Sequence, residues 1–130
     1  MISTRYDPPG RENRHMSEQI PAYAVGYLRD VVFGDDIIRY LREIDATLEP
    51  FGGEFIVHGG QIEAVEGEWD GALVIIRFPD RPSAIGWYES ADYQRILALR
   101  VQNSRSMAAI VDGVKSGHTG STKVDELLSQ

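Results

Sequence analysis

The sequence contains no cysteine and only three histidines among its 130 residues. Without cysteine the chain has no disulfide bonds, no thiol catalysis and no thiolate metal sites, which favours a cytoplasmic setting. No apolar run approaches the roughly 20 residues that a membrane-spanning helix needs, so we expect no membrane partner. The first residues also lack the apolar centre of a secretory signal.

Basic residues are also in short supply, with 13 Lys and Arg against 20 Asp and Glu. The resulting net charge of −7 at pH 7 repels polyanions, so we expect no nucleic-acid partner. Arg95, Arg100 and Arg105 fall in one region, but arginines spaced along a helix usually form its solvated face. A chain of this length is expected to fold as one domain around one core.

Three segments of the chain differ in composition. Residues 1–19 are polar, contain Pro8-Pro9-Gly10 and show no periodicity, so they are predicted to form an N-terminal arm or leader. Residues 115–130 are rich in glycine, serine and threonine, and they are predicted to form a C-terminal arm with at most a short helix over Val124–Leu128. The folded domain is therefore expected over residues 20–114.

The first half of this domain alternates strand and helix patterns. Ala22–Arg29 is predicted to be a strand, and a helix begins at Gly34 or Asp35 and ends near Phe51-Gly52. Two short runs, Glu54–His58 and Gln61–Val65, are then predicted to pair as a hairpin.

The second half begins with a continuous apolar run, Leu73–Phe78, which suits a central strand buried on both faces. A helical stretch then begins at Asp80 and is predicted to break near Ser90, which offers a fresh cap. Met107–Val111 is the last predicted strand. The order β-α-β-β-α-β predicts an α+β, ferredoxin-like fold, in which an antiparallel sheet carries two helices on one face.

The uncovered face of that sheet would be too apolar to face water. Large aliphatic residues occupy both faces of Leu73–Phe78, and burying each contributes about 1.5–3 kcal/mol. We therefore predict a homodimer joined through the sheet faces.

Seven sequence blocks carry a family resemblance. In order along the chain they are FGG, HGG, EGEW, IIRFP, WYESADYQ, ALR and IVDG. With their spacing they resemble the domain-of-unknown-function 1330 (DUF1330) family of the dimeric α+β barrel superfamily, over roughly Tyr23 to Gly113. The resemblance implies a ferredoxin-like protomer whose sheet meets its twin in a barrel. The superfamily includes small monooxygenases that act without a metal, isomerases and haem-handling enzymes, but this family has no generally established activity.

His58 is the chemically distinctive residue of the predicted domain, because the other two histidines lie in the arms. The family commonly has arginine there, so this chain replaces a permanent cation with a group that titrates near neutrality. His58 is a candidate general acid/base, or simply a hydrogen-bonded residue at a strand end. Neither His-x-His nor His-Glu-x-x-His occurs, so we predict no metal and no other cofactor.

Aromatic residues gather on both sides of the predicted break. Trp87, Tyr88 and Tyr93 could turn their rings into a cavity between helices and sheet, or they could simply complete the core. Tyr23 is predicted to join that pocket because its hydroxyl would need a partner if buried.

Arg100 is spaced to share a helix face with Tyr93. It could neutralise an anionic ligand, or pair with Glu89, Asp92 or a carboxylate of a partner subunit.

Two functions remain open at this stage. One is binding of an apolar or aromatic small molecule between sheet and helices, with cofactor-independent acid/base or monooxygenase-like chemistry at His58. The other is a non-catalytic structural or interaction module whose aromatic residues only pack.

Overall fold

A computed structural model describes residues 19–130 of the chain. The predicted arm over residues 1–19 therefore lies almost wholly outside the described residues. The strands are β1 (Ala22–Arg29), β2 (Glu54–His58), β3 (Ala72–Phe78) and β4 (Arg105–Asp112). The helices are α2 (Asp35–Leu48), the 3-10 helix η1 (Glu49–Phe51), α3 (Arg81–Glu89), α4 (Ala91–Val101) and α5 (Gly120–Leu128).

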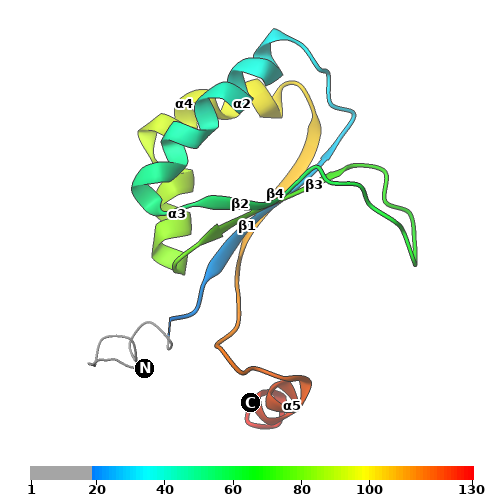
Figure 1. Ribbon diagram of the computed structural model, residues 1–130, viewed down its shortest axis with the longest axis vertical. Coiled ribbons are helices and arrows are strands. Elements are labelled where there is room, and N and C mark those ends of the chain that lie inside the picture. Colours follow the sequence, from blue (N-terminus) through cyan, green and yellow to red (C-terminus); the bar gives the residue numbers. More distant parts are fainter. Residues whose placement is uncertain (1–18) are drawn as a thin grey trace.

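The four strands form one antiparallel sheet in the order β2-β3-β1-β4. Helices α2, α3 and α4 all cover the same face of this sheet (Figure 1). The predicted ferredoxin-like α+β fold is thus confirmed, with the second predicted helix divided into α3 and α4. None of the described helices is long and apolar enough to cross a membrane.

Helix α2 follows from an apolar stripe at helical spacing. Ile37, Tyr40, Ile44 and Leu48 recur every three or four residues and are all buried. Two aspartates in the first turn favour the positive end of the helix dipole. The chain leaves the helix through η1 at Gly52, whose φ of 70° is left-handed and suits glycine.

Serine and aspartate caps define the two helices after β3. The Asp80 carboxylate accepts a hydrogen bond from the Ser83 backbone N–H at 2.8 Å and begins α3. The Ser90 hydroxyl accepts from the Tyr93 N–H at 3.2 Å and donates to the Trp87 carbonyl at 2.7 Å, so it ends α3 and begins α4. The predicted break at Ser90 is confirmed.

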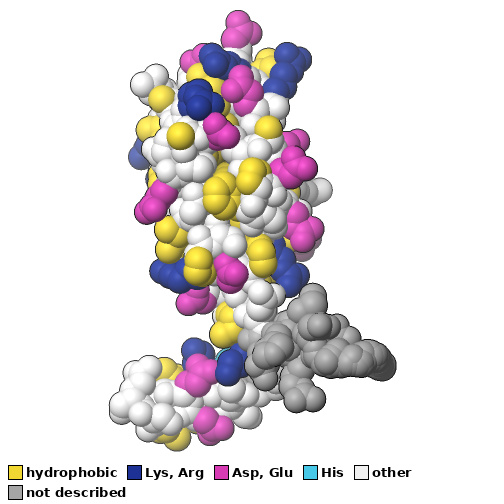
Figure 2. Space-filling model, turned by 90° about the vertical axis from the view of Figure 1, so that its left-hand side faces the viewer, with side chains coloured by type: hydrophobic (Ala, Val, Ile, Leu, Met, Phe, Trp, Pro, Cys, Tyr) yellow, Lys and Arg dark blue, Asp and Glu magenta, His cyan; other side chains and the backbone are white. Residues whose placement is uncertain are grey.

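Side chains alternate between the two faces of the sheet, which we call the inner and outer faces. The inner face, beneath the helices, carries Ala22, Ala24, Gly26, Val74, Ile76, Phe78 and Ile110. The outer face carries Tyr23, Val25, Tyr27, Leu73, Ile75, Met107 and Val111. No described helix covers the outer face (Figure 1), although Trp69 and Asp70 contact Tyr27 at one end of it. By contrast, the solvent side of the helices mixes acidic and basic side chains among scattered apolar ones (Figure 2).

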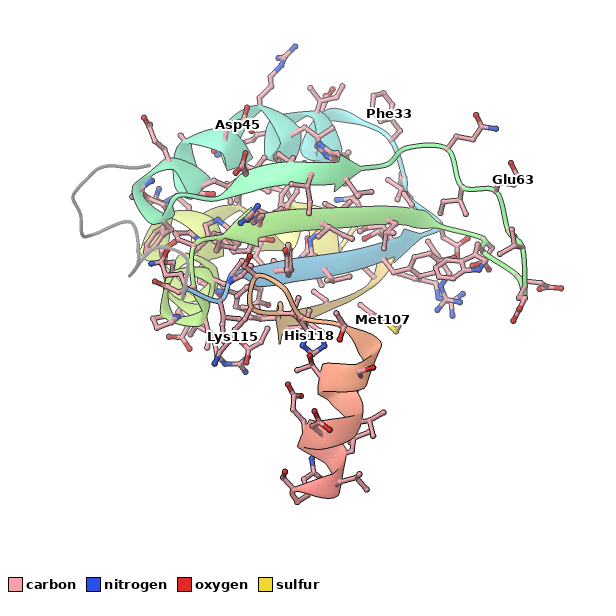
Figure 3. All side chains as sticks on the ribbon, turned by 60° about the horizontal axis from the view of Figure 1, so that its bottom comes forward. Phe33, Asp45, Glu63, Met107, Lys115 and His118 are labelled. Carbon is pink, nitrogen blue, oxygen red and sulfur yellow. The ribbon has the colours of Figure 1, made fainter. Side chains whose placement is uncertain are left out.

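Two predicted elements differ from the structure. Gln61–Val65 is not a strand: β2 pairs directly with β3, and residues 59–71 form an exposed loop that includes Glu63 (Figure 3). Residues 61–65 have no strand to pair with among the described residues, so they do not form a strand despite their β-like sequence. Helix α5 begins at Gly120, four residues before the predicted start, because the Thr119 hydroxyl caps the Thr122 N–H at 3.2 Å.

Candidate functional site

A cavity of about 440 Å³ lies between the inner face of the sheet and the helices that cover it. It is lined by strands β1 to β4, helices α2, α3 and α4, and the loop before α2. Five of the residues predicted to form a site line it: His58, Trp87, Tyr88, Tyr93 and Arg100. The fold thus brings together side chains that lie up to 42 positions apart in the sequence (58 to 100).

Small residues in the middle of the sheet leave room for this cavity. On the inner face Gly26 lies between Val74 and Ala108, and Ala24 precedes it on the same face. A Cβ atom added at Gly26 would make ordinary van der Waals contacts, at 3.4 Å to Leu28 and 3.9 Å to Val74, so a side chain there would meet no clash, and Gly26 lines the cavity. Larger side chains at these strand positions would fill the cavity, so the small residues are what leave it open.

Two tyrosine hydroxyls meet at the polar end of the cavity. The Tyr40 and Tyr93 hydroxyl oxygens are 2.6 Å apart and share one hydrogen bond. Arg100 adds its guanidinium: Nη2 donates to the Tyr93 hydroxyl at 3.5 Å, and Nη1 donates to the Ser106 hydroxyl at 2.7 Å. Arg100 also lies 6.0 Å from the centre of the Tyr40 ring. We call Tyr40, Tyr93, Arg100 and Ser106 the polar cluster.

The guanidinium of this cluster is buried without a counter-ion among residues 19–130. Arg100 is only 8% exposed, and no carboxylate within that range lies at ion-pair distance from it. Asp92, one of the predicted partners, instead pairs with Arg95 at 3.1 Å. The expectation that the three arginines form a solvated face is wrong for Arg100, because its position on α4 turns it toward the sheet.

The protonation states in the cluster follow from its surroundings. Burial raises the pKa of Tyr40 far above its ordinary value, and the adjacent Tyr93 raises it further, so Tyr40 is neutral at physiological pH. Burial lowers the pKa of Arg100, but Tyr93 and Tyr40 outweigh that effect and raise it overall. The cavity therefore holds a permanent positive charge beside a neutral phenol.

Aromatic rings form one wall of the cavity. The Trp87 ring centre lies 4.1 Å from that of Tyr93, and Tyr88 packs 5.6 Å from Tyr93. The Trp87 indole N–H donates to the Thr47 hydroxyl at 2.9 Å, and Thr47 donates to the Ile44 carbonyl at 2.6 Å. Sequence reasoning missed Thr47; its only signal was its place three residues after Ile44, on the buried stripe of α2.

His58 reaches the cavity only because strand β2 contains a bulge. Phe55 pairs with Ile76 but Val57 pairs with Ile75, so the register shifts at Ile56. The shift turns both Phe55 and His58 to the inner face, where their rings stack with centres 4.0 Å apart. His58 is exposed at the end of the strand, so it stands at the mouth of the cavity.

The structure places Tyr40, and not Tyr23, at the cavity. Tyr23 pairs with Arg77 and Val111 and belongs to the outer face, so its predicted place in the pocket is wrong. In a strand a difference of one residue decides the face. Tyr40, for which the sequence leaves both pocket and core open, supplies the buried hydroxyl of the cavity instead.

The described residues offer no ready metal site. Among residues 19–130 no three His, Asp or Glu side chains converge to hold an ion. The polar side chains that line the cavity are the guanidinium groups of Arg100 and Arg81, hydroxyls and one imidazole, and Arg81 already pairs with Asp112 at 3.0 Å. This set of groups suits an organic anion better than a cation.

Three solved structures resemble this one. A protein of unknown function from Rhodopseudomonas palustris is 18% identical, with a TM-score of 0.52 over 86% of this chain and 99% of that chain. A dimeric ferredoxin-like protein of unknown function from Jannaschia sp. CCS1 is 16% identical, with a TM-score of 0.49 over 70% of this chain and 97% of that chain. A variant of SnoaB, a cofactor-independent oxygenase from Streptomyces nogalater, is 12% identical, with a TM-score of 0.48 over 77% and 96%.

At these identities the likeness concerns the fold alone. No curated protein matches the chain. Residues 21–114, however, match the family described as "Domain of unknown function (DUF1330)", and this segment contains the whole sheet, α2, α3 and α4. The chain therefore belongs to the DUF1330 family.

Proposed function

We propose that the protein binds an apolar or aromatic small molecule in the cavity between the inner face and the helices. The observation that carries this proposal is an apolar cavity of about 440 Å³ into which a few polar groups converge. Ligand sites in proteins have volumes of roughly 300–1,000 Å³ and the same character.

The walls of the cavity suit a flat ligand. Trp87 and Tyr88 supply rings on one side, and Ala24, Gly26 and Ala108 supply a smooth floor on the other. An aromatic ligand between them would gain contact area with rings that already have fixed partners. The fixed rings reduce the conformational entropy lost on binding.

Filling the floor tests the proposal. Gly26 has space above it, so Gly26→Leu is expected to fold and to occupy the cavity. We expect calorimetric titration to detect binding of the neutral probe 2-naphthamide to the native protein and to detect none for Gly26→Leu. Ala98→Leu, at an exposed position of α4, is the matched control and keeps the affinity. Equal binding by Gly26→Leu and the native protein would show that the ligand sits elsewhere.

His58 is the group proposed to exchange protons with a bound molecule. It stands at the mouth of the cavity, and its ring is held by stacking on Phe55. The imidazole of His58 can accept a proton from an activated substrate without a cofactor, as metal-independent oxygenation or isomerisation requires. Replacing it should abolish turnover of a substrate while leaving its affinity nearly unchanged. If His58→Ala retains both, His58 has no catalytic role.

A non-catalytic module is the second candidate. Its support is that the polar groups of the aromatic residues already have partners within the protein. The Tyr40 and Tyr93 hydroxyls hydrogen-bond to each other and the Trp87 N–H donates to Thr47, as in an ordinary core. This candidate predicts that no small molecule protects the protein from thermal unfolding. A rise in melting temperature with 2-naphthamide would exclude it.

We also propose that a second copy of the chain covers the outer face. Met107 is 62% exposed and Val111 49%, and Val25, Leu73 and Ile75 lie beside them on the outer face. Because the exposed apolar side chains belong to one face of a single sheet, a self-complementary partner can bury them in one isologous contact. Sedimentation at micromolar concentration is expected to give the mass of a dimer, and a monomer would contradict this arrangement.

A further inference from the structure

We infer that the molecule bound in the cavity carries a carboxylate, and that Arg100 with its neighbouring hydroxyls recognises that group. This inference rests on the proposed small-molecule site and names the chemical class of its ligand. Its starting point is the buried guanidinium of the polar cluster, which has no carboxylate partner among residues 19–130.

A buried charge is costly unless it is paired and fully hydrogen-bonded. Burial of Arg100 therefore needs compensation, and Ser106 and Tyr93 supply only neutral oxygens. A protein that needed only packing at this position could use leucine or methionine at lower cost. The retained charge indicates that an anion completes the cluster.

Counting hydrogen atoms shows what the cluster can still donate. A guanidinium has five N–H bonds, and two of those on Arg100 point to Ser106 and Tyr93. The others are left for the neighbouring Tyr40 and for a ligand. Tyr40 and Tyr93 share one hydrogen bond, so one of their two hydroxyl hydrogens is also spare. Every remaining N–H and O–H is a donor, and Arg100 and both tyrosines line the cavity.

A carboxylate fits this set of donors. It has two oxygens that accept hydrogen bonds, and the planar fork of arginine matches it in a bidentate pair. The cluster offers an extra O–H beside that fork, while the rest of the lining is mostly apolar, with His58 and Arg81 as its other charged or polar side chains. The ligand is therefore an aromatic or aliphatic acid whose carboxylate meets Arg100 and whose body lies between the aromatic wall and the small residues of the sheet.

A carboxylate from a second subunit is a poor alternative in the proposed dimer. Arg100 lies on α4 above the inner face, whereas the second copy is proposed to cover the outer face. The sheet itself would separate the partner from the guanidinium. The counter-ion is thus expected to come from a bound molecule.

Two probes of the same shape test the inference. 2-Naphthoate carries a carboxylate and 2-naphthamide a neutral amide, so their ratio of dissociation constants isolates the charge. We expect the native protein to bind the acid about 10- to 100-fold more tightly, the range of a charge-assisted hydrogen bond. In Arg100→Gln this preference should vanish while the amide still binds. Arg95→Gln, which changes an exposed arginine of the same helix, is the control and keeps the preference.

Each other outcome has a definite meaning. Equal affinity for both probes in the native protein overturns the carboxylate inference but leaves the small-molecule site intact. Failure of both probes to bind at millimolar concentration overturns the inference and the site together. Should Arg100→Gln fail to fold by circular dichroism, Arg100→Lys replaces it: the single ammonium is expected to lose most of the preference, and an unchanged preference would contradict bidentate recognition.

Discussion

The inner and outer faces of the sheet carry similar apolar residues but meet different surroundings. The inner face packs under three helices, and Ala22, Ile76 and Phe78 are almost completely buried there. The outer face has no cover in the described chain, and Met107 and Val111 are about half exposed or more. The same strands therefore supply a closed core on one side and an open apolar surface on the other.

The two faces differ in the size of the partner that each could bind. The helices stand off the middle of the inner face over Gly26 and Ala108, so the space left there is that of a small molecule and is bordered by a charge. The outer face is broad and its exposed side chains are apolar, which suits the surface of another protein better than a small molecule. One face is suited to a ligand and the other to a partner copy.

The largest effect should come from truncation within the covered core. Phe78 is fully buried, so Phe78→Ala is expected to lower the free energy of unfolding by about 3–5 kcal/mol through lost contacts and a new cavity. Val111→Ala on the outer face is the matched truncation and should cost less than about 1 kcal/mol in dilute protein. Urea unfolding measures both. Similar losses at the two positions would break the distinction between the faces.

A charge on the outer face should act on assembly and leave the fold intact. Met107→Glu would bury an unpaired carboxylate in the proposed dimer interface. We therefore expect the dissociation constant of the dimer to rise at least about 100-fold. Ala46→Glu, at an exposed position of α2, is the control. Sedimentation equilibrium measures the dissociation constant. A dimer of unchanged affinity would place the interface elsewhere.

The aromatic wall depends on one hydroxyl. Thr47→Val keeps the side-chain shape but leaves the Trp87 N–H without its acceptor, and the expected loss is about 1–3 kcal/mol of stability. Thr47→Ser retains the hydroxyl and should lose clearly less. Thermal unfolding followed by tryptophan fluorescence compares the two. Equal stability of the valine and serine variants would mean that the bond adds nothing.

The smallest effect concerns the cap of α3 and depends on pH. Hydrogen bonds from Ser83 lower the pKa of Asp80, so its stabilising contribution is present above the ordinary value of 3.8 and disappears as the pH falls through the lower folded value. Asp80→Ala should cost about 1 kcal/mol at pH 7, and the difference from the native protein should shrink in acid. Asp80→Asn caps the helix without ionising, so the difference in free energy of unfolding between Asp80→Asn and Asp80→Ala should not change with pH. Urea unfolding curves at several pH values measure both differences.

Local patterns predicted most of the fold. The strand at Ala22–Arg29, the helix after Gly34 and the break at Ser90 depend on periodicity and on caps formed within a few residues, which a sequence displays directly. The strand predicted over Gln61–Val65 failed because a strand exists only where another strand pairs with it. Pairing is a property of distant residues.

The candidate site was predictable in its residue types and less so in its geometry. Tyr93 and Arg100 share a face of α4 as their spacing indicated, and Trp87 and Tyr88 line the cavity beside them. The bulge at Ile56, which turns His58 inward, is set by the pairing of β2 with β3 and leaves no local signature. The contact between the Tyr40 and Tyr93 hydroxyls joins residues 53 positions apart.

The sequence by itself determined the order of strands and helices, the family and the apolar character of both faces of the sheet, because these follow from short-range periodicity and from blocks of residues along the chain. Only the tertiary structure decided which tyrosine faces the cavity, that Arg100 is buried with no carboxylate from residues 19–130 beside it, and that the small residues around Gly26 leave room for a cavity. The cavity and the surroundings of Arg100 are formed by side chains from several separate elements. They exist only once those elements have packed together.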